Sequence, residues 1–237
     1  MKPSGYVIYR GPSLIDSKPI VAIASTNSKN TKTGNMIQTY ILVDNQTLPV
    51  QNYQSLADYS ICGDCKHRRG LGGACYVNVG QGPTQVFKSY LKGNYPVDLN
   101  GAAMASKGRK IRIGTYGDPA SVPVFVWESL IKYASGHTGY THQWATTTNP
   151  IKHLCMASVD SVSELLEARS KGWRSFRVRD LSESVQPNEF ICPASNEGNK
   201  RKLCQDCLAC DGSDRKNKAS PVIIAHGSLK SRFKVAA

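Results

Sequence analysis

The chain has 237 residues, 40% of them hydrophobic, and carries 30 Lys and Arg against 17 Asp and Glu, a formal net charge of +13. This composition is typical of one large or two small soluble domains, and no run of about 18 apolar residues predicts a membrane span. The N-terminal residues lack the pattern of a secretion signal, so we expect a cytoplasmic protein without a membrane partner. The charge favours nucleic acid or another polyanion as a partner, and a solvated basic surface is the alternative.

The first part of the chain is predicted to be extended. Three runs rich in β-branched and aromatic residues are separated by turn-forming residues: 6–9, 19–25 and 36–43. We therefore expect residues 1–35 to form a β-rich segment packed on the core. The segment 84–93 is predicted to be a short helix that Thr84 caps and Gly93 ends.

From residue 110 onward, predicted strands alternate with predicted helices. The strands expected here are 110–116, 139–144, 153–160, 173–180, 189–195 and 221–228. The helices are expected within 121–136, capped by Ser121, and within 161–172, which opens with a Ser-x-x-Glu capping box. This alternation predicts an α/β protein with a parallel sheet, arranged as a partial (β/α) barrel over 36–195, with an open doubly wound sheet as the alternative.

Residues 196–237 are expected to form a Cys-rich, basic lobe that binds metal and contributes the final strand. Polar or reactive residues recur where the predicted strands end: Tyr116, Gly117, Asp118, His142, Gln143, Trp144, Ser158, Asp160, Arg177, Arg179, Cys192, Ser195, His226 and Gly227. Because the carboxyl ends of parallel strands collect functional groups in one crevice, we expect a shared site. Taken singly, each residue also fits a turn, a helix cap or the core.

Seven of the eight cysteines fall into two groups, which we call group 1 (Cys62, Cys65 and Cys75) and group 2 (Cys192, Cys204, Cys207 and Cys210). In a reducing compartment, clustered cysteines favour metal ligands over disulfides. The remaining Cys155 alternates with Ser158 and Asp160 along its predicted strand, so we expect it to be buried among apolar side chains and not to bind metal.

The two groups differ in how completely they can enclose a metal. The four thiolates of group 2, spaced C-x11-C-x2-C-x2-C, can surround either one zinc ion or one [4Fe–4S] cluster. The three thiolates of group 1, spaced C-x2-C-x9-C, leave two interpretations. One is a [4Fe–4S] cluster with one open iron, and the other is a structural zinc site that takes His67 as its fourth ligand.

This pattern resembles the radical S-adenosylmethionine superfamily, in which a three-cysteine loop follows the first strand of a partial barrel. The resemblance implies that group 1 binds a [4Fe–4S] cluster whose open iron chelates S-adenosylmethionine, and that group 2 binds an auxiliary cluster. It further implies cofactor contacts for Tyr116, Gly117 and Asp118 with the amine, and for Ser158 and Asp160 with the ribose and carboxylate. The superfamily's usual loop is CxxxCxxC, which differs from the spacing found here.

Several longer phrases, among them GPSLIDSKPIVAIA, SICGDCKHR and GYTHQW, also make the chain similar to a cysteine-rich family found in phages, plasmids and bacteria. That second resemblance implies no particular activity.

Three functional hypotheses follow. The first is an iron–sulfur enzyme of radical S-adenosylmethionine type that acts on an anionic substrate such as a nucleic acid or nucleotide. The second is a non-enzymatic zinc protein whose Lys- and Arg-rich C-terminal region binds nucleic acid. The third is an enzyme that uses a divalent metal with His142, His226 and Asp118. No catalytic residue is assigned at this point.

Overall fold

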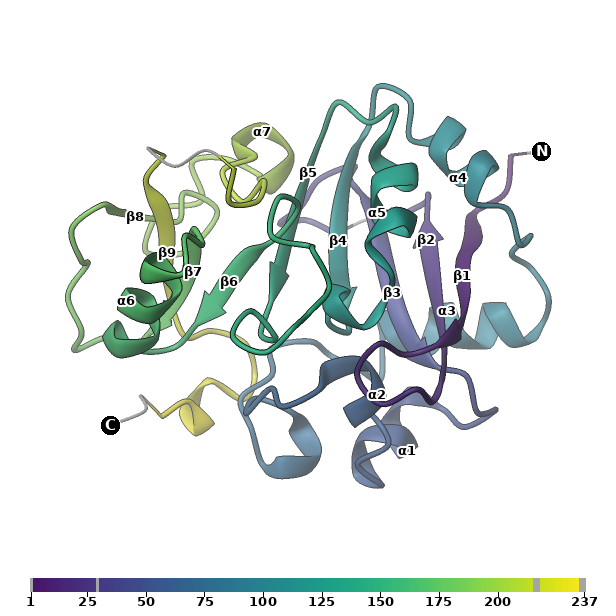
Figure 1. Ribbon diagram of the computed structural model, residues 1–237, viewed down its shortest axis with the longest axis horizontal. Helices are drawn as coiled ribbons and strands as arrows, with labels where there is room; N and C mark the ends of the chain where they lie inside the picture. Colours follow the sequence, from purple (N-terminus) through teal and green to yellow (C-terminus); the bar gives the residue numbers. More distant parts are fainter. Residues whose placement is uncertain (1, 29, 215–217, 235–237) are drawn as a thin grey trace.

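The computed structural model describes residues 2–28, 30–214 and 218–234 (Figure 1). Its strands are β1 Gly5–Pro12, β2 Pro19–Ser25, β3 Ile37–Val43, β4 Lys110–Tyr116, β5 Gly136–Thr141, β6 Met156–Val159, β7 Ser175–Arg179, β8 Glu189–Ile191 and β9 Ser220–Ile224. Its α-helices are α1 Pro49–Gln54, α2 Tyr59–Cys62, α3 Gly82–Leu91, α4 Leu99–Ala105, α5 Val124–Ile131, α6 Val162–Ser170 and α7 Cys204–Cys207. Short 3-10 turns are η1 Arg69–Leu71, η2 Pro119–Ser121 and η3 Lys230–Arg232.

The described strands form one nine-stranded sheet in the order β1-β2-β3-β4-β5-β6-β7-β9-β8. The pairs β1–β2 and β2–β3 are antiparallel, and every later pair in the sheet is parallel. The prediction of an α/β protein with a mostly parallel sheet is therefore confirmed. This sheet is not closed, because β1 and β8 do not pair with each other.

The main hydrophobic core contains residues of strands β1 and β2 and of the parallel strands β3, β4 and β6. Strand β2 is buried at every position after Pro19, and β3 at every position except Tyr40. Such continuous burial requires cover on both faces, which explains why β2 is apolar almost throughout rather than alternating; β3 also buries the polar Gln38 and Thr39. Helix α5 contributes the fully buried Trp127 and Leu130 to the same core, and α3 contributes Phe87.

One of the three predicted helix N-caps is present in the structure, and two are not. Ser161 does cap α6, since its hydroxyl accepts the Glu164 amide at 3.1 Å. The prediction for Ser121 is wrong, because this hydroxyl donates to the Asp118 carbonyl and α5 begins later, after Pro123. Thr84 does not cap α3 either: the helix begins at Gly82, and the Thr84 hydroxyl donates to the carbonyl of Val79. No described helix is long and apolar enough to cross a membrane.

The C-terminal strand is inserted into the sheet. β9 lies between β7 and β8, so the chain leaves the sheet edge at β8, runs through 192–219 and returns one strand further in. The excursion carries α7 and all four group 2 cysteines. Arg177 of β7 and Glu189 of β8 reach each other on one side of β9, with Arg177 Nη2 2.8 Å from Glu189 Oε2, and both side chains are fully buried.

Candidate functional site

The loop 61–77, which carries group 1, lies beyond the carboxyl ends of the central strands (Figure 1). The amide of Asp118, just after β4, donates to the Ile61 carbonyl at 2.6 Å. The side-chain amide of Gln143, after β5, donates to the Cys62 carbonyl at 3.0 Å. After β6, Asp160 lies 2.9 Å from His67. Three successive strand ends therefore meet one loop.

Asp118 ties the end of β4 to the end of β5. Its buried carboxylate accepts the Thr141 hydroxyl at 2.7 Å, the His142 amide at 2.7 Å and the Ala120 amide at 3.0 Å. Burial raises the pKa of Asp118, although these hydrogen bonds and His142 oppose the shift. The carboxylate of this predicted cofactor residue is thus engaged with neighbouring strand ends, and it fixes the backbone of His142.

The two residues before Asp118 pack inward. Gly117 has a φ of +80°, and a Cβ there would lie 2.7 Å from Cβ of Ile41, so only glycine fits without strain. The Tyr116 side chain is buried in the main core. Together they bring the β4 end close against β3.

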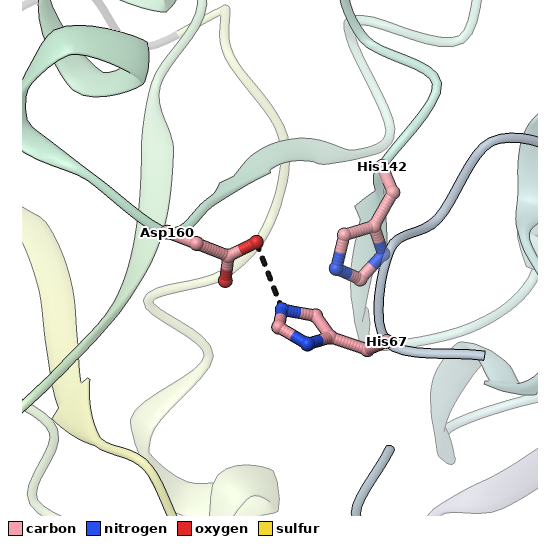
Figure 2. A group of neighbouring side chains, drawn as sticks. All are labelled: His67, His142 and Asp160. Carbon is pink, nitrogen blue, oxygen red and sulfur yellow. Dashed lines mark ion pairs between the residues drawn. The ribbon is translucent and has the colours of Figure 1, made fainter. Parts of the chain in front are cut away.

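His67, His142 and Asp160 converge from three different loops (Figure 2). The His67 ring packs edge-on against His142 with centroids 5.8 Å apart, and it stacks on Phe233 at 5.6 Å. Lys66 also pairs with Asp160, at 3.3 Å. Burial opposes ionisation of Asp160, but His67, His142 and Lys66 outweigh it and lower the pKa of this carboxyl.

The pairing of Asp160 with the group 1 loop was not predicted. The spacing of group 1 made His67 a candidate zinc ligand, yet the His67 ring faces Asp160 at the end of β6 instead. The one available signal was opposite charge, since basic Lys66 and His67 balance acidic Asp160 and Glu164. Charge alone does not identify partners about a hundred residues apart.

The three group 1 thiols lie close enough to influence one another. Their residues are partly exposed, and the thiols themselves are surrounded by protein. Burial raises the pKa of Cys65 to about 12 and that of Cys75 to about 11, and it raises that of Cys62 as well. The thiols of Cys65 and Cys75 add to the shift at Cys62. A metal cation would reverse this preference, because it stabilises thiolates.

All four group 2 cysteines line one cavity. Cys204 and Cys207 come from the single turn of α7, Cys192 follows β8, and Cys210 follows α7. The remaining wall consists of Thr138, Tyr140, Pro193, Ala194, Leu208, Ala209 and Pro221. The segment 192–210 folds back on itself and so brings together the four cysteines that their spacing in the sequence had grouped.

Neither group has the close sulfur spacing of a tetrahedral zinc site. With Zn–S bonds of about 2.3 Å, four thiolates lie roughly 3.8 Å apart. Among the described residues, the only three or more His, Cys, Asp or Glu side chains whose ligand atoms all lie within 4.8 Å of one another are His67, His142 and Asp160. In the described structure, therefore, no three sulfurs of either group all lie within 4.8 Å of one another.

Two basic side chains near group 2 have no acidic partner within 4.0 Å in the described part of the chain, Arg112 and Lys32. Arg112 is 9% exposed, donates to the Tyr76 hydroxyl at 3.0 Å and lies over the Tyr140 ring at 5.0 Å. Lys32 lies 3.3 Å from His226. A buried, uncompensated cation is costly, and thiolates of group 2 would supply the missing negative charge.

The other predicted strand-end residues have structural partners. Trp144 donates to the Ser158 carbonyl at 3.1 Å, and Gly227 lies directly against Tyr76. Arg177 and Arg179 pair with acidic side chains beside β8, the latter with Glu197. Cys155 is fully buried in the main core, as expected.

Comparison with family models, curated proteins and solved structures found no match for this chain.

His226 gives a pH prediction. Burial, reinforced by the nearby Lys32 charge, lowers the pKa of His226 to about 4, against about 6.5 in an unfolded chain. Between pH 4 and pH 6.5, His226 is protonated in the unfolded chain but neutral in the folded protein. The stability that comes from the neutral, buried imidazole is therefore fully present above about pH 6.5 and is lost as the pH falls towards 4. We expect urea unfolding to lose up to about 3 kcal/mol over this window. The variant His226→Gln should lack that step, and an identical pH profile would contradict the assignment.

Proposed function

We propose that the protein is an iron–sulfur enzyme of radical S-adenosylmethionine type. The observation that carries the proposal is the position of group 1. Its loop follows β3, the first strand with a parallel neighbour, and meets the carboxyl ends of β4, β5 and β6. The parallel strands β3 to β7 follow each other in chain order, as a partial barrel requires.

Group 1 fits a centre with one open ligand position. Three thiols lie near one another, and His67, the only histidine within the loop, faces Asp160 instead of completing a fourth position. When bound, a [4Fe–4S] cluster with an open iron supplies an electron for the reductive cleavage of S-adenosylmethionine. Because Asp160 is already paired with His67 and Lys66, Ser158 and the backbone of 116–118 remain as the groups that contact this cofactor.

Group 2 fits an auxiliary cluster in a Cys-rich lobe formed by 192–219. Its four cysteines line one cavity, and four thiolates complete the coordination of a [4Fe–4S] cluster. The buried Arg112 and the partly exposed Lys32 would balance part of the negative charge of four thiolates, and nearby positive charge also raises the affinity of the centre for electrons. The alternative for group 2 is a structural zinc site with the same four thiolates.

The substrate we propose is anionic. The net charge of +13 attracts polyanions over the whole surface, and a nucleotide or nucleic acid is the simplest such substrate. We expect the enzyme to work in a reducing compartment such as the cytoplasm, since eight free thiols persist there.

The test is cofactor cleavage by protein that has been purified and reconstituted with iron and sulfide without oxygen. After reduction with dithionite, the wild type is expected to convert S-adenosylmethionine into 5′-deoxyadenosine and methionine. Cys62→Ala and Cys65→Ala should abolish the conversion. Cys155→Ala is the matched control, because it removes a sulfur from the core and leaves both groups intact. Absence of 5′-deoxyadenosine from a fully iron-loaded wild type would refute the proposal.

A further inference from the structure

The side chains of His67, His142 and Asp160 form a cluster outside both cysteine groups. We propose that they bind one first-row divalent cation. Two imidazoles and one carboxylate are a donor set that holds Mn²⁺, Fe²⁺ or Zn²⁺ and leaves further coordination positions open. The proposal does not rest on the proposed function, since none of its ligands belongs to group 1 or group 2.

The spacing of the donor atoms suits a single ion. Bonds of about 2.1 Å at right angles separate two adjacent ligand atoms by roughly 3.0 Å. His67 Nε2 lies 2.9 Å from Asp160 Oδ2, and the ligand atoms of all three residues lie within 4.8 Å of one another. A small rotation of the His142 ring, which is partly exposed, brings the third donor into range.

Two atoms in the cluster are buried without an aligned hydrogen-bond partner among the described residues, His67 Nε2 and Asp160 Oδ1. The Asp160 side chain is 2% exposed, and that of His67 is 15% exposed. Leaving such atoms unsatisfied is unfavourable, and the two residues that carry them already touch through Asp160 Oδ2, 2.9 Å from His67 Nε2. A cation is the ligand that satisfies a nitrogen lone pair and a carboxylate oxygen together.

The surrounding contacts hold the three donors in place. The amide of His142 donates to Asp118, and the amide of Asp160 donates to the Glu164 carboxylate at 2.6 Å. Phe233 stacks on the His67 ring. Fixed outer contacts of this kind are what orient metal ligands in proteins.

Among the residues that the structure describes, Lys66 is the cation paired with Asp160 and therefore the group that opposes a metal ion here. Its ammonium lies 3.3 Å from Asp160 Oδ2 and 3.0 Å from Glu164 Oε1, and its side chain is 40% exposed. Lys66 can remain paired with Glu164 when Asp160 binds the metal instead. Lys66→Gln is therefore expected to tighten metal binding about fivefold, a gain that a purely structural role for the cluster does not predict.

The test is titration with Mn²⁺, followed by the electron paramagnetic resonance signal of the free ion. Mn²⁺ prefers nitrogen and oxygen ligands, so the cysteines compete little. We expect one ion per wild-type chain, and binding at least about tenfold weaker in His142→Ala, His67→Asn and Asp160→Asn. His153→Ala is the control, because His153 pairs with Glu128 on α5, away from the cluster.

Circular dichroism establishes that each variant is folded, and His142→Ala, at a partly exposed position, is the variant least prone to unfold. Unchanged Mn²⁺ affinity in folded His142→Ala would overturn the proposal, as would a wild type that binds no Mn²⁺ at millimolar concentration. Binding that persists in Cys62→Ala supports the site even if cofactor cleavage is never observed. The two proposals can therefore fail separately.

Discussion

Replacing Cys204 and Cys207 together with serine is expected to remove about four irons per chain and to destabilise the segment 192–219 strongly. This segment has few apolar contacts of its own: the small cluster around Cys192, Ala194 and Ile223 is its buried anchor. α7 is a single turn of four residues, too short to be stable alone. Metal centres in such segments contribute folding free energy on the order of 10 kcal/mol.

Iron analysis of the purified variant measures the first effect, and limited proteolysis measures the second. Proteolysis is expected to cut within 192–219 many times faster than in the wild type. The Cys62 and Cys65 double variant is the comparison, since it should lose the other four irons and keep 192–219 protected. Full iron content in the Cys204 and Cys207 variant would mean that group 2 holds no cluster.

Replacing Arg177 with methionine is expected to lower the free energy of unfolding by about 3–5 kcal/mol. The Arg177 guanidinium binds both carboxylate oxygens of Glu189, at 3.0 and 2.8 Å, and both side chains are fully buried. Nη1 also lies 3.2 Å from Glu183. Removing the cation leaves a buried carboxylate without its counter-charge, which costs far more than the lost packing.

The double variant Arg177→Met with Glu189→Leu is the control for that experiment. It removes both charges, so urea unfolding should recover most of the loss. Equal destabilisation in the single and double variants would mean that packing, not the uncompensated charge, dominates at this position. Because Arg177 and Glu189 join β7 to β8 across β9, the loss is expected to weaken the sheet edge that leads into group 2.

Much of the fold follows from local pattern. β2 and β4 were predicted at their observed positions, because runs rich in β-branched residues that end at turn-forming residues favour strands. Helix α4 was missed, since LNGAAMA combines a glycine with small residues and has no clear apolar stripe. Ser121 was misassigned because it ends the η2 turn, which begins at Pro119 of the Gly-Asp-Pro break, and its hydroxyl donates to the Asp118 carbonyl.

The order of the strands in the sheet could not be predicted from the local sequence pattern. The sequence placed 221–228 last among the strands, but nothing in it shows that β9 inserts between β7 and β8. That choice depends on tertiary contacts such as the Arg177–Glu189 pair, whose members looked like ordinary charged residues.

In the candidate site, too, some residues could be grouped from the sequence and others only from the fold. Cysteine spacing grouped the residues that line the group 2 cavity, since short spacings bring ligands together almost regardless of fold. The cluster of His67, His142 and Asp160 draws on three loops, so only the sheet topology reveals it. Asp118 was correctly located at a strand end, yet its hydrogen bonds to Thr141 and His142 depend on β5 lying beside β4.

The most direct test of the account is the iron and sulfide content of the wild type purified without oxygen, measured together with its absorbance. Two [4Fe–4S] clusters predict about eight irons and eight sulfides per chain and a broad band in the visible region. Stoichiometric zinc in a colourless protein that takes up no iron on reconstitution would contradict the iron–sulfur assignment of both cysteine groups.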